Sequence, residues 1–234
     1  MTNLYTWYPQ TQFCYFANPR KDIFVATKGG HNNESHNHND VGTCNVYIDR
    51  QPILIDVGVE TYSRKTFSGE RYTIWTMQSY YHNLPAPNGI AQKNGGNYKA
   101  SDVTSRRNFF SLNIAGAYPK EAGVEKWIRS YELRNNQVLI DDQFTLTEAK
   151  APNMINFISW GKIEKKGKGQ ITIQVQQVKA LLMFDEQQFD VTLEPIKVED
   201  SQLKRIWGDQ VYRISFKARQ IQPNGNYLFV LKKL

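Results

Sequence analysis

The 234-residue sequence has few cysteines, no long apolar run and almost no helical periodicity. Its two cysteines, Cys14 and Cys44, are too few for a disulfide framework, and the sequence leaves open whether they pair. No apolar stretch approaches the length of a membrane-spanning helix, so we expect no membrane partner. The N-terminus lacks a charged segment followed by an apolar one, so we expect no secretory signal in this chain.

Concentrated charge is also missing. The formal net charge is +7, but no block of basic residues resembles a nucleic-acid-binding arm, and KKGKGQ at residues 165–170 is typical of a turn. A basic balance alone fits either a nucleic acid or an acidic polysaccharide. Because no nucleic-acid motif is present, we expect no nucleic-acid partner. The hydrophobic fraction of 40% is that of a globular protein, and no linker divides residues 1–234, which predicts a single domain.

Alternation of apolar and polar residues runs through most of the chain. The sequence QITIQVQ at residues 170–176 places Ile171, Ile173 and Val175 on one face, as in a half-buried antiparallel strand. The same pattern predicts strands over residues 22–28, 44–49, 52–58, 138–146, 189–195, 211–218 and 227–233. Turn signals separate these runs. Many short strands predict an all-β fold, a large antiparallel β-sandwich with long loops.

Residues 62–100 interrupt the alternation. This segment is polar, aromatic and rich in Gly and Asn, and we expect loops with a short helix laid over one face of the sandwich. Aromatic residues make up 13% of the whole chain. That content is typical of a β-rich protein, or of one that stacks rings on a sugar.

Histidine is scarce and concentrated. Three of the four histidines lie in HNNESHNHND, residues 31–40, and the fourth is His82. If the segment around His36 and His38 is extended, both imidazoles point the same way. Neutral imidazoles on one side of a strand are good zinc ligands, and Asp56 or His82 can complete the set. The alternatives are a hydrogen-bonded loop histidine for His38 and a turn cap for Asp56.

The spacing of Gly30, His36 and His38 also matches the opening of the cupin metal motif. Cupins place a Glu after three or four further residues, where this chain has Gly42 and Thr43. The later part of that motif is unmatched too. A cupin-type oxygenase or isomerase is therefore disfavoured.

Three longer stretches carry a more specific signal: KGGHNNESHNHNDVGT at 28–43, PILIDVGVETY at 52–62 and RYTIWTMQSYYHNLPAPNG at 71–89. Together they resemble the C-terminal β-sandwich domain of the heparinase II/III-like polysaccharide lyases. The strong resemblance covers about residues 7–100. The remainder agrees as a β-rich continuation.

Members of that family cleave acidic polysaccharides by β-elimination at a uronic acid. The uronate carboxylate is neutralised, a Tyr or His base removes the C5 proton, and an acid protonates the leaving glycosidic oxygen. An (α/α) toroid domain precedes the sandwich in the family and carries most of these groups. These 234 residues show no helical toroid, so the resemblance implies that activity needs this partner domain. It also implies a periplasmic or secreted parent protein.

The resemblance assigns roles to particular residues. His36 matches the catalytic histidine that faces the substrate cleft, and His38, Asp56 and His82 match the ligands of a metal, generally zinc. Their spacing agrees with the family pattern. The remaining candidates are substrate contacts from Arg71, Trp75, Tyr80 and Tyr81, and loop residues behind the histidines, Asn37, Asn39 and Asp40.

These observations lead to one hypothesis and one alternative. The hypothesis is the β-sandwich domain of a lyase for heparin- or heparan-sulfate-like polysaccharides, with a zinc site and one cleft histidine, inactive alone. The alternative is a non-catalytic carbohydrate-binding module that a metal stabilises.

Overall fold

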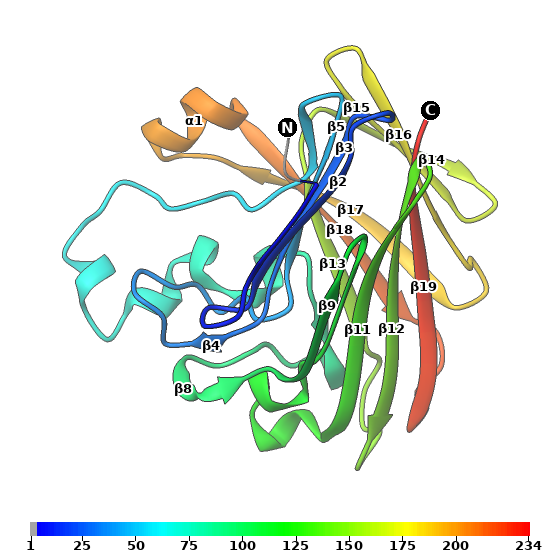
Figure 1. The fold of residues 1–234 in the computed structure, drawn as a ribbon. Helices are drawn as coiled ribbons and strands as arrows, with labels where there is room; N and C mark the ends of the chain where they lie inside the picture. Colours follow the sequence, from blue (N-terminus) through cyan, green and yellow to red (C-terminus); the bar gives the residue numbers. More distant parts are fainter. Residues whose placement is uncertain (1–3) are drawn as a thin grey trace.

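The computed structural model describes residues 4–234 and contains two layers of antiparallel strands (Figure 1). One layer is an eight-stranded sheet in the order β14-β15-β16-β19-β12-β11-β10-β9. Its strands in chain order are β9 (Ser101–Arg106), β10 (Phe109–Asn113), β11 (Val124–Arg134), β12 (Gln137–Leu146), β14 (Lys162–Gly167), β15 (Gln170–Val175), β16 (Val178–Phe184) and β19 (Asn224–Lys233).

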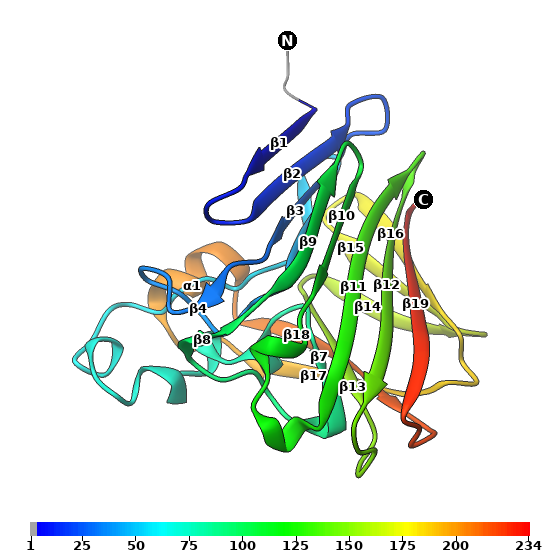
Figure 2. The same ribbon diagram turned by 60° about the horizontal axis from the view of Figure 1, so that its bottom comes forward.

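Two smaller sheets form the other layer. The five-stranded sheet has the order β1-β2-β3-β5-β6, with β1 (Tyr5–Tyr8), β2 (Phe13–Asn18), β3 (Ile23–Lys28), β5 (Cys44–Ile48) and β6 (Gln51–Leu54). The four-stranded sheet has the order β17-β18-β13-β7, with β7 (Pro85–Ala86), β13 (Met154–Ser159), β17 (Phe189–Lys197) and β18 (Gln210–Ala218). A short pair, β4 (His31–Asn32) and β8 (Gly95–Lys99), lies beside them (Figure 2).

Both smaller sheets pack on the large one through their inward-facing residues. Trp7 of the five-stranded sheet lies against Phe110 of β10, with ring centroids 5.9 Å apart. Phe157 and Phe216 of the four-stranded sheet both contact Phe229 of β19. One continuous cluster of buried apolar side chains therefore joins the sheets. The predicted all-β sandwich is confirmed.

The predicted strands all occur, and one is shorter than expected. A strand was predicted over residues 52–58, but the observed strand β6 ends at Leu54. The backbone N–H of Ile55 donates instead to Ile158 of β13, 2.9 Å away. The chain thus leaves its partner strand β5 for the neighbouring sheet, and Asp56 lies two residues beyond the strand end.

The 62–100 segment consists mainly of single 3₁₀ turns. They are η1 (Lys65–Phe67), η2 (Arg71–Thr73), η3 (Trp75–Met77), η4 (Ser79–Tyr81) and η5 (Pro87–Gly89). Two further 3₁₀ turns, η6 (Ala115–Ala117) and η7 (Lys120–Ala122), lie before β11. Figure 1 shows the turns of residues 62–84 on the same side of the sandwich as the loop between β3 and β5.

A short helix, α1 (Ser201–Trp207), was not predicted from the sequence. Asp200 caps it, because its carboxylate accepts from the backbone N–H groups of Gln202 and Leu203. The same carboxylate accepts from Thr61, and the indole of Trp207 donates to the carbonyl of Val57. The helix therefore fixes the stretch that follows Asp56.

Cys14 and Cys44 are both buried and free. They lie on β2 and β5, which are separated by β3. Among the described residues, no helix is long and apolar enough to cross a bilayer.

Candidate metal centre

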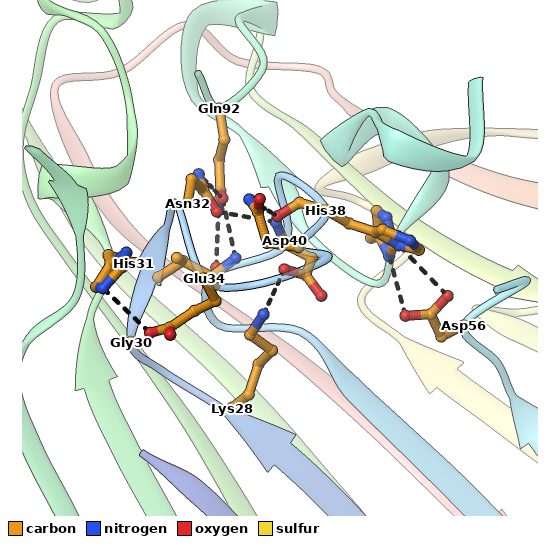
Figure 3. A network of polar contacts seen from close by, with 12 residues as sticks. Lys28, Gly30, His31, Asn32, Glu34, His38, Asp40, Asp56 and Gln92 are labelled. Atoms are coloured by element: carbon orange, nitrogen blue, oxygen red, sulfur yellow. Dashed lines mark hydrogen bonds and ion pairs between the residues drawn. The ribbon is translucent and has the colours of Figure 1, made fainter. Parts of the chain in front are cut away.

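The loop that joins β3 to β5 is held by a network of buried amides (Figure 3). The Asn32 side chain accepts from the backbone N–H of Asp40 at 3.1 Å and donates to Gln92 at 3.0 Å. Gln92 in turn accepts from the backbone N–H of Val41 and donates to its carbonyl. These bonds satisfy polar groups that would otherwise be buried unpaired, and they fix the histidine-bearing loop.

The structure contradicts the expectation that His36 and His38 share one face of an extended segment. The loop turns here, with the N–H of Asn37 bonded to the carbonyl of Glu34, and His36 has a left-handed φ of 58°. His38 is buried, whereas His36 is exposed. The two imidazoles nevertheless line the same cavity.

His38, Asp56 and His82 converge from three separate segments of the chain. The Nδ1 atom of His38 lies 3.8 Å from Oδ1 of Asp56, and Nδ1 of His82 lies 3.7 Å from Oδ2. Both distances are too long for a hydrogen bond. The two rings are tilted by 50° with centroids 5.1 Å apart. Figure 3 shows both dashed contacts reaching the single carboxylate of Asp56.

The donor set fits a metal ion. Within residues 4–234, both Nδ1 atoms are buried and have no hydrogen-bond partner, which is costly for imidazole nitrogens unless an ion takes their lone pairs. Nε2 of His82 lies 3.0 Å from the carbonyl of Thr76, which holds the proton on that nitrogen and leaves Nδ1 free to ligate. Two ligands about 2.1 Å from a tetrahedral zinc would lie about 3.4 Å apart, close to the observed separations.

Asp40 belongs to the same cluster. Its ligand atom and those of His38, Asp56 and His82 all lie within 4.8 Å of one another. Its Oδ1 also pairs with Nζ of Lys28 at 2.7 Å, and both side chains are buried. From the sequence alone, Asp40 was predicted to lie behind the histidines. The structure brings it within reach of the ion as well, with Lys28 offsetting its charge.

The electrostatics favour the ligating forms of these residues. Burial lowers the pKa of His38, against the opposing pull of Asp56, so the neutral imidazole is favoured. Burial acts to raise the pKa of Asp56, but His82, His38 and the N–H of Gly58 together lower it. Asp56 is therefore ionised near neutral pH while His38 is neutral.

Asn83 connects two of the candidate ligands. Its side-chain amide donates to the carbonyls of Cys44 and Ile55, and its oxygen accepts from the N–H of Ile158. Asn83 follows His82 directly, and Ile55 precedes Asp56. One fully buried amide thus sets the relative position of both segments. Asn83 was not predicted from the sequence, because only its burial distinguishes it from a surface loop asparagine.

The His36 imidazole lies beside Tyr62. Their rings are nearly parallel, 7° apart, and Nδ1 of His36 lies 3.3 Å from the phenolic oxygen. Tyr62 also packs edge-on against the exposed Phe67. His36 is therefore presented to solvent at the mouth of the cavity, where a ligand can reach it.

The four candidate substrate contacts are engaged within the protein. Arg71 donates to the carbonyls of Asn37 and Thr66, and Trp75 donates to the carboxylate of Glu60. The hydroxyl of Tyr80 donates to the carbonyl of Gly89. The Tyr81 ring contacts the indole of Trp75 edge-on and lies beneath the guanidinium of Arg213. All four side chains are partly exposed, so a substrate could still contact them. Their roles toward a substrate stay predictions.

The two loop asparagines are buried, as a role in shaping the loop requires. The amide of Asn37 donates to the carbonyl of His38, and its oxygen accepts from the hydroxyl of Tyr72. The backbone N–H of Asn39 donates to the carbonyl of Met77, 2.9 Å away. These bonds tie the histidine loop to the 62–84 segment, which carries His82.

A cavity of about 510 Å³ opens beside the cluster. Its lining includes His36, His38, Asp40 and Asp56, together with Lys28 and Asn45. Three of the candidate ligands, His38, Asp40 and Asp56, thus line the cavity together with the exposed His36, whereas His82 lies outside its lining. A ligand in this cavity can approach the metal site and His36 at the same time.

No protein-family model matches the chain, and no curated protein matches its sequence. Structural similarity is extensive. A mutant of the heparan sulfate lyase HepC from Pedobacter heparinus matches all of the chain with a TM-score of 0.74 at 16% identity. The heparinase III BT4657 gene product gives 0.75 at 17% over the whole chain, and a further heparinase III gives 0.71 at 14% over 98%.

This chain has the fold of a heparinase III domain. It spans 36–37% of the length of those structures, which fits the C-terminal domain of that family. The resemblance drawn from the sequence motifs is thus confirmed at the level of the fold. The sequence identities of 14–17% to these structures are low, so the similarity establishes the fold and does not by itself establish an activity.

Proposed function

We propose that this chain is the β-sandwich domain of a polysaccharide lyase that cleaves uronic-acid-containing polysaccharides, of the heparin or heparan sulfate type, by β-elimination. One observation carries the proposal. Within a heparinase III fold, the buried and unpartnered Nδ1 atoms of His38 and His82 face the carboxylate of Asp56.

Zinc is the ion that this donor set suits best. Two imidazoles and one carboxylate are a common zinc set, and Asp40 or an exogenous ligand can occupy the fourth position. When bound, the ion supplies folding energy and a fixed positive charge beside the cavity. His38, Asp56 and His82 would thereby tie the histidine loop, the end of β6 and the 62–84 segment to one point.

His36 is the residue of this chain that we place at the substrate. It is exposed, lies at the mouth of the cavity, and is oriented by Tyr62. In β-elimination a base takes the C5 proton, the bond from C4 to the glycosidic oxygen breaks, and that oxygen receives a proton. The helical domain would supply the remaining acid–base groups, so the chain alone is inactive in this proposal. The parent protein acts in the periplasm or outside the cell.

A second candidate function is a non-catalytic carbohydrate-binding module that the metal stabilises. The position of the cluster favours it. His38, Asp56 and His82 join three chain segments that otherwise contact one another mainly through loop hydrogen bonds. In that case the metal site is needed for folding, and His36 is dispensable for every activity of the parent protein.

The deciding experiment measures metal content and activity together. Elemental analysis of the purified chain should give about one zinc per chain, lost in His38→Ala and retained in His31→Ala, which removes a partly exposed histidine outside the cluster. The chain is then mixed with the helical domain of a heparinase III, and heparan sulfate cleavage is followed by the ultraviolet absorbance of the unsaturated product. Cleavage that needs His36 supports the lyase. A zinc-loaded chain for which His36→Ala changes nothing supports the binding module.

A further inference from the structure

The outer face of the five-stranded sheet departs from the usual pattern. The inward positions of its strands carry the core, including Phe16, Val25 and Val46. The outward positions, which face away from the core, should then be polar. Instead, β2, β3 and β5 present aromatic and small side chains there, listed as Phe13, Tyr15, Ala17, Phe24, Ala26 and Tyr47.

The aromatic rings form one connected row across the strands. Centroids of Phe13 and Tyr15 are 6.4 Å apart, those of Tyr15 and Phe24 are 5.9 Å apart, and those of Phe24 and Tyr47 are 5.9 Å apart. Tyr8 extends the row at its edge, 6.0 Å from Tyr15. Phe24 is 37% exposed and Tyr8 is 51% exposed, so the row faces solvent. A contiguous, partly exposed aromatic surface of this kind is typical of interaction sites.

This row borders a groove that leads to the candidate metal site. A second cavity of about 460 Å³ is lined by Phe24, Tyr47 and Arg50, and it shares Tyr15, Ala26 and Asn45 with the cavity beside His36. Tyr15, Ala26 and Asn45 are direct cross-strand partners, so they form one line across the sheet. The two cavities meet at this line and make one open trough. Ala26 lies at the bottom of the trough, because its small side chain is flanked by the larger ones of Tyr15 and Asn45.

Two polar atoms in the trough have no partner. Among the described residues, neither Oδ1 of Asn45 nor Oγ1 of Thr43 makes a hydrogen bond, and both atoms are buried. Both residues line the cavity beside His36. Buried polar atoms are normally satisfied, and both side chains border the space in which a ligand with hydroxyl groups would lie.

We propose that the trough binds an extended carbohydrate chain that runs from the metal site across the outer face of the five-stranded sheet. This inference rests on the function proposed above and adds the residues that hold the substrate away from the reacting bond. Sugar rings lie against Tyr15, Phe24 and Tyr47, and sugar hydroxyls donate to Asn45. Arg50, which has no ion-pair partner within residues 4–234, meets an acidic substituent at the far end.

The chemistry of the trough selects a sugar over a protein partner. A pyranose ring offers both apolar C–H faces and hydroxyl donors, which match an aromatic row interrupted by an unpaired amide oxygen. An apolar protein surface would cover the rings but would offer no hydrogen-bond donor to the Asn45 side chain. Asp22 lines the same cavity as Arg50, which favours a moderately charged chain over a densely sulfated one.

The test measures binding, not catalysis. A heparan sulfate hexasaccharide is titrated by calorimetry into the metal-loaded chain and into the double variant Phe24→Ala/Tyr47→Ala. We expect at least 10-fold weaker binding, with metal content and unfolding midpoint unchanged. The matched control is Ile206→Ala/Ile221→Ala, which removes two exposed apolar side chains outside the trough and should leave the affinity unchanged. The variant Ala26→Leu fills the floor without removing a ring, and it should weaken binding similarly.

Each outcome decides a separate point. Unchanged affinity in both trough variants, or no binding by the native chain, overturns the inference while the metal content still supports the proposed function. The native chain can also prove to be metal-free while its hexasaccharide binding depends on Phe24 and Tyr47. That result supports the trough and contradicts the metal assignment. If the double variant keeps its affinity but changes its association state in sedimentation, the face is a protein interface and the inference is wrong.

Discussion

The guanidinium of Arg129 donates to the backbone carbonyl of Asn83, 2.8 Å away, directly behind the candidate ligand His82. Arg129 is completely buried and faces the equally buried carboxylate of Asp142 at 3.2 Å. The hydroxyl of Tyr131, two residues further along β11, donates to the carbonyl of Gly42 in the histidine loop. The core strand β11 therefore supports both sides of the metal cluster.

Removing Arg129 alone should destabilise the fold strongly. Arg129→Met leaves the Asp142 carboxylate buried without a counter-charge, and we expect a loss of about 3–5 kcal/mol in the free energy of unfolding. The double variant Arg129→Met/Asp142→Leu should recover part of that loss, because no unpaired charge remains. Urea unfolding of both proteins measures the difference. Recovery is only partial because the buried indole N–H of Trp127 loses its acceptor, Asp142, in the double variant. A double variant no more stable than the single one would show that the lost bonds to Asn83 and Trp127 outweigh the orphaned charge.

Gly42 should be irreplaceable, in contrast to Gly69. Gly42 has a φ of +85°, and an added Cβ would lie 2.6 Å from the buried Ile114 side chain. Gly42→Ala should therefore cost about 1–3 kcal/mol of stability and weaken metal binding, because the histidine loop must shift. Gly69 has open space around it, so Gly69→Ala should stay within about 0.5 kcal/mol of the native value. Thermal unfolding and zinc titration of the pair check this, and equal behaviour of the two variants would contradict it.

The sequence predicted the strands and the heparinase-like sandwich because their signals are local or extended motifs. Alternation over residues 170–176 and 211–218 directly reflects one buried face. The helix at Ser201–Trp207 was missed because seven residues are too few to show a helical period, although Asp200 was a readable cap.

The site was predicted only in part. His38, Asp56 and His82 come together as the motif resemblance implied, but the extended His36–His38 geometry was wrong because a turn reverses the loop there. The nearness of Asp40 and the support from Arg129 depend on contacts between residues distant in the chain. No local pattern encodes such contacts. The aromatic row was visible only as composition, since its alignment depends on strand register.

Removal of the metal should lower the free energy of unfolding by an amount that depends on the affinity of the folded chain for the ion. An ion that binds only the folded chain stabilises it by about 2.7 kcal/mol at a free concentration 100 times the dissociation constant. Adding EDTA to the zinc-loaded chain should therefore lower the unfolding midpoint measured by calorimetry. Asp56→Asn, which removes the carboxylate between the two histidines, should unfold at the same temperature with and without EDTA. An EDTA effect that persists in Asp56→Asn would place the ion elsewhere.

The metal-free chain should lose stability as the pH falls through the acidic range. Burial lowers the pKa of His38 below its unfolded value of about 6.5, so the unfolded chain takes up a proton first. The contribution of His38 is thus fully present above about pH 6.5 and is lost as the pH falls toward the folded-state pKa. Urea unfolding in EDTA between pH 8 and pH 5 should show this slope, and His38→Gln should reduce it. His31→Gln serves as the control, because its partly exposed imidazole lies outside the cluster. If the His38→Gln and native slopes coincide, burial does not hold His38 in the neutral form that a metal requires.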